Sequence, residues 1–344
     1  MHEGSGGGVS NYERELANNL KDITDINLIT KFTKPPKIPV IDPHLRRPLV
    51  VRKMINQMDS ADLVHLPSQQ YAPALIKSDF DRPVVVTVHD LIPYVTNLTP
   101  FYRKLSSHLS VEGLKIADQI ICISKHTKND ILKHTKISEK QISVVYPSAE
   151  LEFDEISDSQ YINEKYDISG EYILYVGSKA KRKNIFTLIR SLKYTPDINL
   201  VLVGRAPFPF KSKKIEAYSR IHGVSERVIQ TGYVEKEELG RFYKDTLAFV
   251  FPSLYEGFGR PPLEAMSMGT PVIASSATAI PEVVNDACLL CDPTQATEWA
   301  DAVQQIRDDE NLAKELISAG HKRADEFDFE KTAIKTKNIY DKII

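Results

Sequence analysis

Short apolar runs rich in β-branched residues alternate with helical patterns along nearly the whole chain. This alternation is typical of βαβ units and constrains the fold more than any other feature, because such units build parallel sheets. Helices are predicted at Asn11–Leu20, Arg46–Met58 and Lys125–His134, and the tail from Gln295 onward is helical. The predicted strands are Ile26–Thr30, Asp62–Leu66, Val84–Val88, Gln119–Ser124, Ile142–Tyr146, Tyr172–Gly177, Asn199–Gly204, Val228–Thr231, Ala248–Pro252, Pro271–Ala274 and Cys288–Cys291.

The alternation is interrupted once, at Pro147–Asp167. This stretch is rich in Ser, Asp and Glu and lacks a long apolar period, so we interpret it as a linker. A chain of 344 residues is also too long for one ordinary core. We therefore expect two doubly wound α/β domains, residues 1–150 and 168–325, and a C-terminal helix at 326–344 packing back on the first domain.

Composition excludes several classes of protein. A formal net charge of −2 gives no global field for nucleic acid, so we expect no nucleic-acid partner. Cys288 and Cys291 form a C-x-x-C in an apolar run without a second Cys pair or a nearby His, which favours small buried residues over a zinc or redox site. Three cysteines, no long apolar span and no signal-peptide pattern predict a cytoplasmic protein. Contact with the inner face of a membrane stays open.

Ligands of open parallel sheets bind beyond the carboxyl ends of the strands, and four segments have suitable residues there. The first is the glycine-rich loop Gly4–Gly8 before a helix, where backbone N–H groups can approach a phosphate. A disordered N-terminus explains this segment equally well. A strand should precede such a loop, and Met1–Glu3 is too short for one, so we expect the first strand of the N-terminal sheet to be missing.

The second segment is the buried strand Val84–Val88, which is followed directly by His89 and Asp90. At the end of a strand, His89 would point into the expected cleft and could hydrogen-bond a substrate hydroxyl. A strand-end histidine satisfied by nearby backbone is the alternative. The position in a cleft favours the functional interpretation.

The third segment is a run of cations that begins immediately after Gly177. Four cations in five positions after a strand could neutralise a leaving diphosphate. Charge runs usually form solvated faces, and we expect Lys183 first and Arg182 second to point inward. The four residues are Lys179, Lys181, Arg182 and Lys183.

The fourth segment, Ser253–Gly269, predicts a glycine-containing loop followed by a helix at Pro261–Met268. Glu256 lies in the loop and Glu264 about one turn into the helix, so the two carboxylates can address two ends of one ligand. A carboxylate accepts from vicinal hydroxyls, which suits a ribose or a hexose. Acids at a helix start are also explained by the helix dipole, but that does not explain the flanking glycines or the double proline.

In these residues the chain resembles the retaining glycosyltransferases of family 4, which have the GT-B fold of two Rossmann-like domains facing each other across a cleft. The resemblance is densest over Gly232–Pro293, which includes AFVFPSLYEGFGRPPLEAM and GTPVIASSATAIPEVV. The spacing of Glu256 and Glu264, E-x7-E, is highly specific in this setting. Shorter similarities at Gly7–Leu20, Val84–Leu91, Ala117–Ser124, Ile142–Pro147 and Tyr172–Asn184 extend it over nearly the whole chain.

The resemblance implies a role for each candidate residue. Glu264 would hold the donor ribose, and Glu256 with the loop Gly257, Phe258 and Gly259 would hold the transferred sugar. Lys183 and Arg182 would neutralise the diphosphate without a bound metal or cofactor, and His89 would contact the sugar near the reacting carbon. The remaining predicted donor contacts are Gly7 and Gly8 over the phosphates, Gly204, Arg205, Tyr233 and Val234 near the base, and Leu263 on the helix.

Three departures from the family pattern affect this transfer of roles. Ser178 stands where an Arg is frequent, which places more weight on Lys183 and Arg182. Residues 147–149 lack a glycine that often follows this strand. Arg260 occupies a position that is often apolar, and it could reach a phosphate or an anionic acceptor.

The resemblance implies transfer of a hexose from a GDP- or UDP-sugar to a glycan or lipid-linked acceptor. The HD and EGFGRPP patterns look most like those of mannosyltransferases, which favours GDP-mannose. The resemblance to the family also implies a role in polysaccharide biosynthesis. The alternatives are a nucleotide-sugar epimerase or phosphorylase of the same fold, and a non-catalytic nucleotide-sugar-binding subunit. A dinucleotide dehydrogenase is disfavoured, because no strand–GxGxxG–helix unit with a downstream acid is present.

Overall fold

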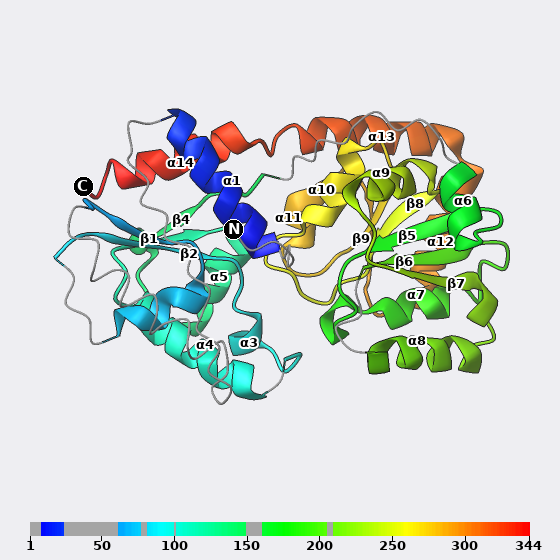
Figure 1. Ribbon diagram of the computed structural model, residues 1–344, viewed down its shortest axis with the longest axis horizontal. Coiled ribbons are helices and arrows are strands. Elements are labelled where there is room, and N and C mark those ends of the chain that lie inside the picture. The colour runs from blue at the N-terminus through cyan, green and yellow to red at the C-terminus, as the bar shows by residue number, and fades with distance from the viewer. Residues whose placement is uncertain (1–7, 24–60, 77–80, 100, 149–159, 205–208) are drawn as a thin grey trace. The chain divides into compact units, whose positions relative to one another are not determined.

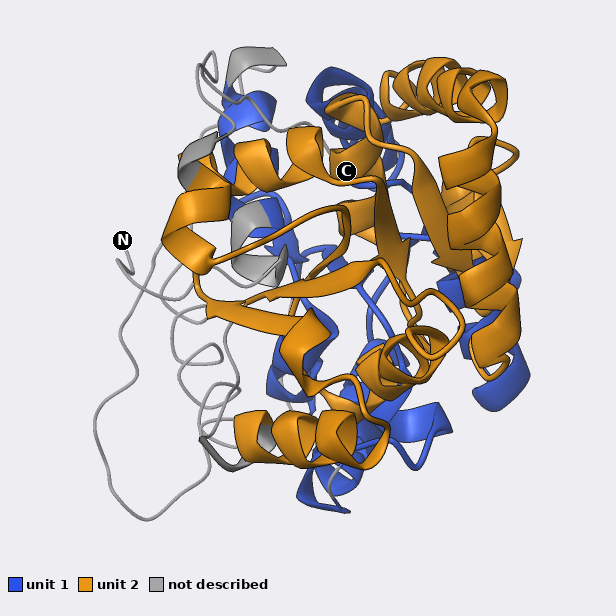
Figure 2. Cartoon of the chain, turned by 90° about the vertical axis from the view of Figure 1, so that its right-hand side faces the viewer, with its two compact units in different colours: residues 1–148, 328–344 blue, residues 149–327 orange. Residues whose placement is uncertain are grey.

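The computed structural model describes the chain except for residues 1–7, 24–60, 77–80, 100, 149–159 and 205–208 (Figure 1). It divides into two compact units, shown in two colours in Figure 2. The N-terminal unit consists of residues 1–148 together with 328–344, and the C-terminal unit of residues 149–327. The C-terminal tail therefore belongs to the N-terminal unit.

The N-terminal unit contains a parallel sheet in the order β1-β2-β3-β4. Val64 pairs with Val84, Val85 with Gln119, and Ile120 with Ile142. Every residue of β2 is buried because the strand has a neighbour on each side and helices on both faces. The strands are β1 (Val64–Leu66), β2 (Val84–Val88), β3 (Gln119–Cys122) and β4 (Ile142–Val144).

Two sets of helices cover the faces of this sheet. On one face Val86 packs with Leu75 and Leu114, from η1 (Gln69–Leu75) and α4 (Phe101–Leu114). This side also includes α3 (Ile92–Val95) and α5 (Lys125–His134), and the short helix η2 (Glu139–Gln141) precedes β4. On the other face Val85 and Ile121 pack with the first and last helices of the chain, α1 (Gly8–Ile23) and α14 (Phe329–Tyr340). These two helices lie side by side, although they come from opposite ends of the sequence (Figure 1).

The C-terminal unit contains a six-stranded sheet in the order β10-β9-β8-β5-β6-β7, with all pairs parallel. From β5 the chain adds β6 and β7 on one side, and it then returns to add β8, β9 and β10 on the other. The order therefore reverses between β5 and β8, which is the position where open α/β sheets commonly bind their ligands. The strands are β5 (Tyr172–Val176), β6 (Asn199–Val203), β7 (Val228–Gly232), β8 (Ala248–Phe251), β9 (Val272–Ser275) and β10 (Leu289–Cys291).

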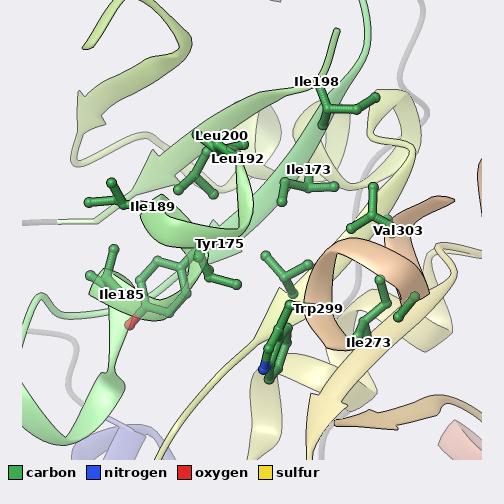
Figure 3. Close-up of a cluster of buried hydrophobic side chains, with 14 of the residues drawn as sticks. Ile173, Tyr175, Ile185, Ile189, Leu192, Ile198, Leu200, Ile273, Trp299 and Val303 are labelled. Atoms are coloured by element: carbon green, nitrogen blue, oxygen red, sulfur yellow. The ribbon is translucent and has the colours of Figure 1, made fainter. Parts of the chain in front are cut away.

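Helices cover both faces of this second sheet (Figure 1). Figure 3 shows the core under α7 (Ile185–Ser191) and α12 (Ala296–Asp308). Ile215 of α8 (Pro209–Ile221) belongs to the same core. Trp299 is fully buried there, and its indole N–H donates to the Asp292 carbonyl at 2.9 Å. The other helices are α6 (Gln160–Tyr166), η3 (Lys181–Lys183), η4 (Ser225–Arg227), α9 (Lys236–Asp245), α10 (Arg260–Ser267), α11 (Ile280–Val284) and α13 (Glu310–Ala324).

The strands lie where the sequence predicts them, within one or two residues at their ends. The predicted strand Ile26–Thr30 and helix Arg46–Met58 lie outside the described residues. The linker prediction for Pro147–Asp167 is wrong at its end, because Gln160–Tyr166 forms the helix α6. This short helix is stabilised by tertiary packing: Ile162 is fully buried, and the Tyr166 ring lies 5.4 Å from that of Phe242 on α9. Among the described residues, no helix is both long and apolar enough to cross a membrane.

Candidate active site

The loops after β5 and β8 are joined to each other at the point where the strand order reverses. The Leu254 N–H donates to the Arg182 carbonyl at 2.8 Å, and the Asn184 side-chain amide donates to the Pro252 carbonyl at 3.1 Å. Asn184 adopts a left-handed conformation with φ 54°, which asparagine tolerates better than most residues. The cation run after β5 is thereby fixed against the EGFG loop after β8.

An ion cluster lies between these two loops. Glu256 Oε1 accepts from Arg182 Nη1 at 2.6 Å and from Lys183 Nζ at 2.7 Å. Lys183 and Glu256 are both 8% exposed, whereas the Arg182 side chain is half-buried. Arg182 also donates to the Tyr255 carbonyl, and Lys183 Nζ lies 4.7 Å from the centre of the Phe251 ring. Two cations and one carboxylate thus share a largely buried site at the carboxyl ends of β5 and β8.

Burial and charge act in opposite directions on this cluster. Burial lowers the pKa of Lys183 below its ordinary value, although the Glu256 carboxylate opposes the shift. Burial tends to raise the pKa of Glu256, but Lys183 and Arg182 outweigh it and hold that pKa below its ordinary value. Glu256 is therefore an anion near pH 7. Its backbone N–H donates to Thr278 Oγ1 at 3.1 Å, which fixes the loop that carries it.

Helix α10 begins immediately after this loop. Gly259 precedes it with φ 117°, a conformation that L side chains rarely adopt, and Pro261 follows in the first turn. One turn in, Glu264 accepts from the Tyr243 hydroxyl at 3.3 Å and lies 3.8 Å from Arg260 Nε. The sequence predicted this helix from Pro261, and the structure begins it one residue earlier.

The ends of β5, β6 and β7 approach one another closely. A Cβ atom on Gly204, which has φ 123°, would lie 2.3 Å from the Gly177 carbonyl oxygen. The Gly204 N–H also donates to the Gly232 carbonyl at 2.6 Å. Only glycine fits at position 204. Gly204 is one of four residues predicted to lie near the base of the donor. Of the other three, Tyr233 is more than half exposed, Val234 is buried, and Arg205 lies outside the described residues.

The four cations after β5 do not form one clamp. Lys183 and Arg182 point toward Glu256, whereas Lys181 is exposed. Lys179 is buried in another direction, and its Nζ donates to Gln230 Oε1 on β7 at 2.7 Å. Burial lowers the pKa of Lys179 as well. Local patterns do not predict this contact, because Lys179 lies in the loop after β5 and Gln230 lies on β7, with β6 between the two strands.

Two predicted donor residues are parts of the hydrophobic interior. Leu263 is fully buried on α10, and Phe258 is buried with its ring in edge-to-face contact with Phe327. Their side chains hold the loop and the helix in place.

In the N-terminal unit, His89 lies buried at the end of β2. Its Nε2 is 2.8 Å from the Pro67 carbonyl, and its backbone N–H donates to Gln69 Oε1 at 3.1 Å. Burial lowers its pKa to about 4, so the ring is neutral near pH 7. A neutral ring that donates from Nε2 to a carbonyl presents Nδ1 as an acceptor. Of the predicted glycine-loop residues, Gly8 begins α1, and Gly7 lies outside the described residues.

A second histidine of this unit, the half-buried His65, was not predicted as a site residue. His65 on β1 is hydrogen-bonded through Nε2 to Thr87 Oγ1 at 2.8 Å and through Nδ1 to the Tyr340 hydroxyl. Burial and the nearby His89 lower its pKa to about 3. Tyr12 on α1 lies over His89, with the two ring centres 5.0 Å apart. The sequence could not reveal this network, because it joins positions 65 and 340.

Metal-binding residues do not gather in the described part of the chain: no three His, Cys, Asp or Glu side chains there could share a metal ion. Cys288 and Cys291 are buried free thiols, and burial raises the pKa of each to about 12. Thiols with such pKa values are protonated near pH 7 and are poor metal ligands.

Two family models match the chain. The model described as "Glycosyl transferases group 1" matches residues 158–323, and the one described as "Glycosyltransferase Family 4" matches residues 6–153. Between them they cover both units. The chain belongs to the group 1 glycosyltransferases of family 4.

The relatives by sequence include mannosyltransferases. The chain is 29% identical to O-antigen chain mannosyltransferase B of Escherichia coli over 70% of its own length and 64% of the relative's. It is 27% identical to serotype-specific mannosyltransferase WbdA of E. coli, over 77% of this chain and 34% of that one. The chain thus spans between about a third and two thirds of these relatives.

Solved structures show the same fold. Sucrose-phosphate synthase of Thermosynechococcus elongatus superimposes with a TM-score of 0.81 at 22% identity, covering 98% of this chain and 94% of that one. HepE of Anabaena, solved in complex with UDP-glucose, gives 0.81 at 18% identity over 99% and 98%. The predicted fold, GT-B with two Rossmann-like domains, is confirmed.

Proposed function

We propose that this protein is a retaining glycosyltransferase that moves a hexose, with mannose favoured, from a GDP- or UDP-sugar to a hydroxyl of a glycan or lipid-linked acceptor. The observation that carries the proposal is the cluster of Lys183, Arg182 and Glu256 where the strand order reverses. The mannosyltransferase relatives favour mannose.

The composition of the cluster matches the chemistry of a nucleotide sugar. In such a donor the transferred sugar is bonded directly to the diphosphate, so groups that bind the two parts must be neighbours. Glu256 can accept from sugar hydroxyls, while Lys183 and Arg182 can donate to phosphate oxygens. An ammonium has three donors and a guanidinium five, so each can keep its contact with Glu256 and still bind a phosphate.

The rest of the donor would extend from this cluster along the sheet. Glu264 on α10 would accept from the ribose hydroxyls, and the backbone N–H groups of Gly257–Gly259 would donate to sugar oxygens. The start of α10 would favour the anionic diphosphate through its dipole. Gly204, Arg205, Tyr233 and Val234 would lie near the base.

The proposed transfer forms the new bond on the face of the sugar from which the diphosphate leaves. The acceptor hydroxyl attacks the anomeric carbon, the bond from that carbon to the diphosphate oxygen breaks, and the hydroxyl proton passes to a diphosphate oxygen. Lys183 and Arg182 stabilise the charge that develops on the leaving group, the role a bound metal would otherwise have. Neutral His89 would accept a hydrogen bond from a sugar hydroxyl, and Gly7 and Gly8 would close over the phosphates.

The O-antigen relatives favour an acceptor among intermediates of surface polysaccharides. Such an acceptor would be carried on a lipid, and the protein would work in the cytoplasm at the inner face of the membrane.

The test is transfer from radiolabelled GDP-mannose and UDP-glucose to a panel of glycan and lipid-linked acceptors. Lys183→Ala should lower turnover about 100- to 1000-fold, because a lost transition-state donor costs about 2.7–4 kcal/mol. Lys181→Ala, which removes an exposed cation of the same run, is the matched control and should keep wild-type turnover. Equal turnover in the two variants would contradict the assignment of Lys183 to the diphosphate. Interconversion of the free nucleotide sugar would indicate an epimerase.

Donor identity can be measured without an acceptor. A donor present at about 100 times its dissociation constant should add about 2.7 kcal/mol to the stability of the folded protein. A rise in melting temperature with GDP-mannose, but not with UDP-glucose, would support the mannose assignment.

A further inference from the structure

The chain leaves the C-terminal unit at a short turn that follows α13. Phe327 is the last residue of this unit, and Asp328 begins the other unit as the N-cap of α14. The backbone N–H groups of Asp325, Glu326 and Phe327 donate to carbonyls of the last turn of α13. Phe327 is therefore fixed to α13 up to the point where the chain leaves the unit.

The side chain of Phe327 packs on the EGFG loop (residues 256–259) of its own unit. Phe327 is 5% exposed, and its ring lies edge-on to that of Phe258 with the two centres 5.6 Å apart. In the loop, Phe258 follows the carboxylate of the ion cluster, Glu256, and precedes Gly259, the N-cap of α10. A displacement of the Phe258 ring would therefore move the backbone on both sides of it.

Arg323 ties the same turn to the end of α11. Its Nε donates to the Val283 carbonyl at 2.8 Å, and its Nη2 donates to the Glu282 carbonyl at 2.7 Å. These carbonyls belong to the last turn of α11, where carbonyls lack partners within the helix. The Arg323 guanidinium also lies 4.7 Å from the centre of the Phe327 ring. One side chain thus holds both α11 and Phe327.

The other end of α11 leads back to the EGFG loop. Thr278, which precedes this helix, accepts from the Glu256 N–H at 3.1 Å. Thr278 has φ 59°, a left-handed conformation that β-branched residues rarely adopt, so its surroundings must hold it there. The loop is therefore held at Glu256 by Thr278 and at Phe258 by Phe327, and both contacts lead to Arg323.

We propose that Phe327 and Arg323 are positioning residues of the EGFG loop. They set the conformation in which Glu256 and the backbone N–H groups of residues 257–259 meet the transferred sugar. Because Phe327 is also the residue at which the chain leaves the unit, a change in chain direction there is transmitted to the loop. The inference rests on the proposed function for the identity of the ligand, whereas the contacts that hold the loop lie within one unit.

The first test compares ligands that differ only in the sugar. Titration calorimetry of the full chain measures the dissociation constants of GDP-mannose and GDP, and of UDP-glucose and UDP. Phe327→Leu and Arg323→Met should each weaken the nucleotide sugar about tenfold but the diphosphate about twofold or less, because a small displacement of a binding group is costly. Leucine keeps most of the apolar bulk of phenylalanine, and methionine resembles the stem of arginine, so both variants should fold.

Leu316→Ala is the matched control. Leu316 lies on the same helix, α13, and belongs to the core that also contains Trp299. The variant should lower the melting temperature but keep the ratio of the two dissociation constants. The double variant Phe327→Leu/Arg323→Met should lose little more than the weaker-binding single variant, because both residues act on one loop.

The second test needs no ligand. Hydrogen exchange of peptides that cover residues 253–259 should be about fivefold faster in Phe327→Leu than in wild type, because the loop has lost a contact that holds it. Peptides of β8 should exchange as in wild type, and Leu316→Ala should leave exchange of the loop unchanged.

Three outcomes would overturn the proposal: equal weakening of nucleotide sugar and diphosphate, unchanged loop exchange in Phe327→Leu, or a Leu316→Ala variant that behaves like Phe327→Leu. If wild type binds none of these ligands, the proposed function fails. The exchange measurement then decides alone whether Phe327 holds the loop, so the two failures are distinguishable.

Discussion

The two units keep polar groups buried by opposite means. In the C-terminal unit the buried groups are charged, and Lys183 and Glu256 offset each other at 2.7 Å. In the N-terminal unit His89 is buried and His65 is half-buried, and both are neutral, with hydrogen bonds in place of ion pairs. Their pKa values, about 3 and about 4, lie far below the ordinary value.

The difference suits the two halves of the proposed transfer. A unit that binds a diphosphate needs fixed charges, and a paired carboxylate keeps two neighbouring cations in place before the substrate arrives. A unit that contacts only hydroxyls is better served by neutral acceptors, because a buried charge without a partner is costly. Three perturbations test whether the two units differ in this way, with paired charges in one and neutral histidines in the other. They are taken from the largest expected effect to the smallest.

Glu256→Ala should destabilise the C-terminal unit most, by about 3–5 kcal/mol, because it leaves Lys183 and Arg182 in a buried site without their anion. Urea unfolding followed by tryptophan fluorescence measures this unit, since the only tryptophan, Trp299, lies in its core. Glu310→Ala is the control: it breaks an exposed pair with Lys314 and should change stability by less than about 1 kcal/mol. If the two variants unfold alike, the buried cluster is not the structural element described above.

The contrast was only partly predictable from the sequence. Local patterns sufficed for the elements: the run VVVTV is β2, and Lys125–His134 is α5 because Ser124 caps it by accepting from the Thr127 N–H. The E-x7-E spacing sufficed to single out Glu256, and the cation run after β5 sufficed to single out Lys183. Local patterns could not show that these two side chains bind each other, because 73 positions separate them and two loops must meet first.

The same limit explains what the sequence analysis missed. A cation run predicts a charged surface or a clamp, and nothing in it shows that Lys179 turns toward Gln230 while Lys181 stays in solvent. The short helix α6 lacks an apolar period of its own and depends on its contact with α9. The sequence allows two interpretations of His89, as a ligand contact or as a histidine satisfied by backbone. Its bond to the Pro67 carbonyl satisfies one nitrogen and leaves the other as an acceptor.

The second perturbation is acid. The unfolded chain binds a proton at His89 with the ordinary pKa of 6.5, whereas the folded chain does so only near pH 4, so stability falls as pH drops from 6.5 toward 4. Between pH 6.5 and 4.5 this one group should remove about 2 kcal/mol from the N-terminal unit. Glu256 behaves differently: its pKa is lowered from 4.5, so its contribution is retained until pH falls below that value.

Hydrogen exchange of β2 amides, measured by mass spectrometry at pH 6.5, 5.5 and 4.5 and corrected for intrinsic rates, reports on the N-terminal unit. His89→Gln should lose about 2 kcal/mol of the pH dependence, while His108→Gln, an exposed position on α4, should keep it. A wild-type slope in His89→Gln would mean that the buried neutral histidine is not what makes this unit acid-sensitive.

The smallest loss of stability is expected from the hydrogen bond between the C-terminal helix α14 and the sheet. Tyr340→Phe removes only the hydroxyl that bonds to His65 Nδ1, and it leaves that part-buried nitrogen without this partner at a cost of about 1–2 kcal/mol. Exchange of β1 and β2 amides should quicken about 5- to 30-fold, with Tyr102→Phe on the exposed face of α4 as the control.

Because His65 also bonds Thr87 on β2, the loss should reach the strand that carries His89. Tryptophan fluorescence should show the C-terminal unit unfolding as in wild type. If Tyr340→Phe instead weakened that unit and spared β2, the histidine network would not be the element that holds the N-terminal site.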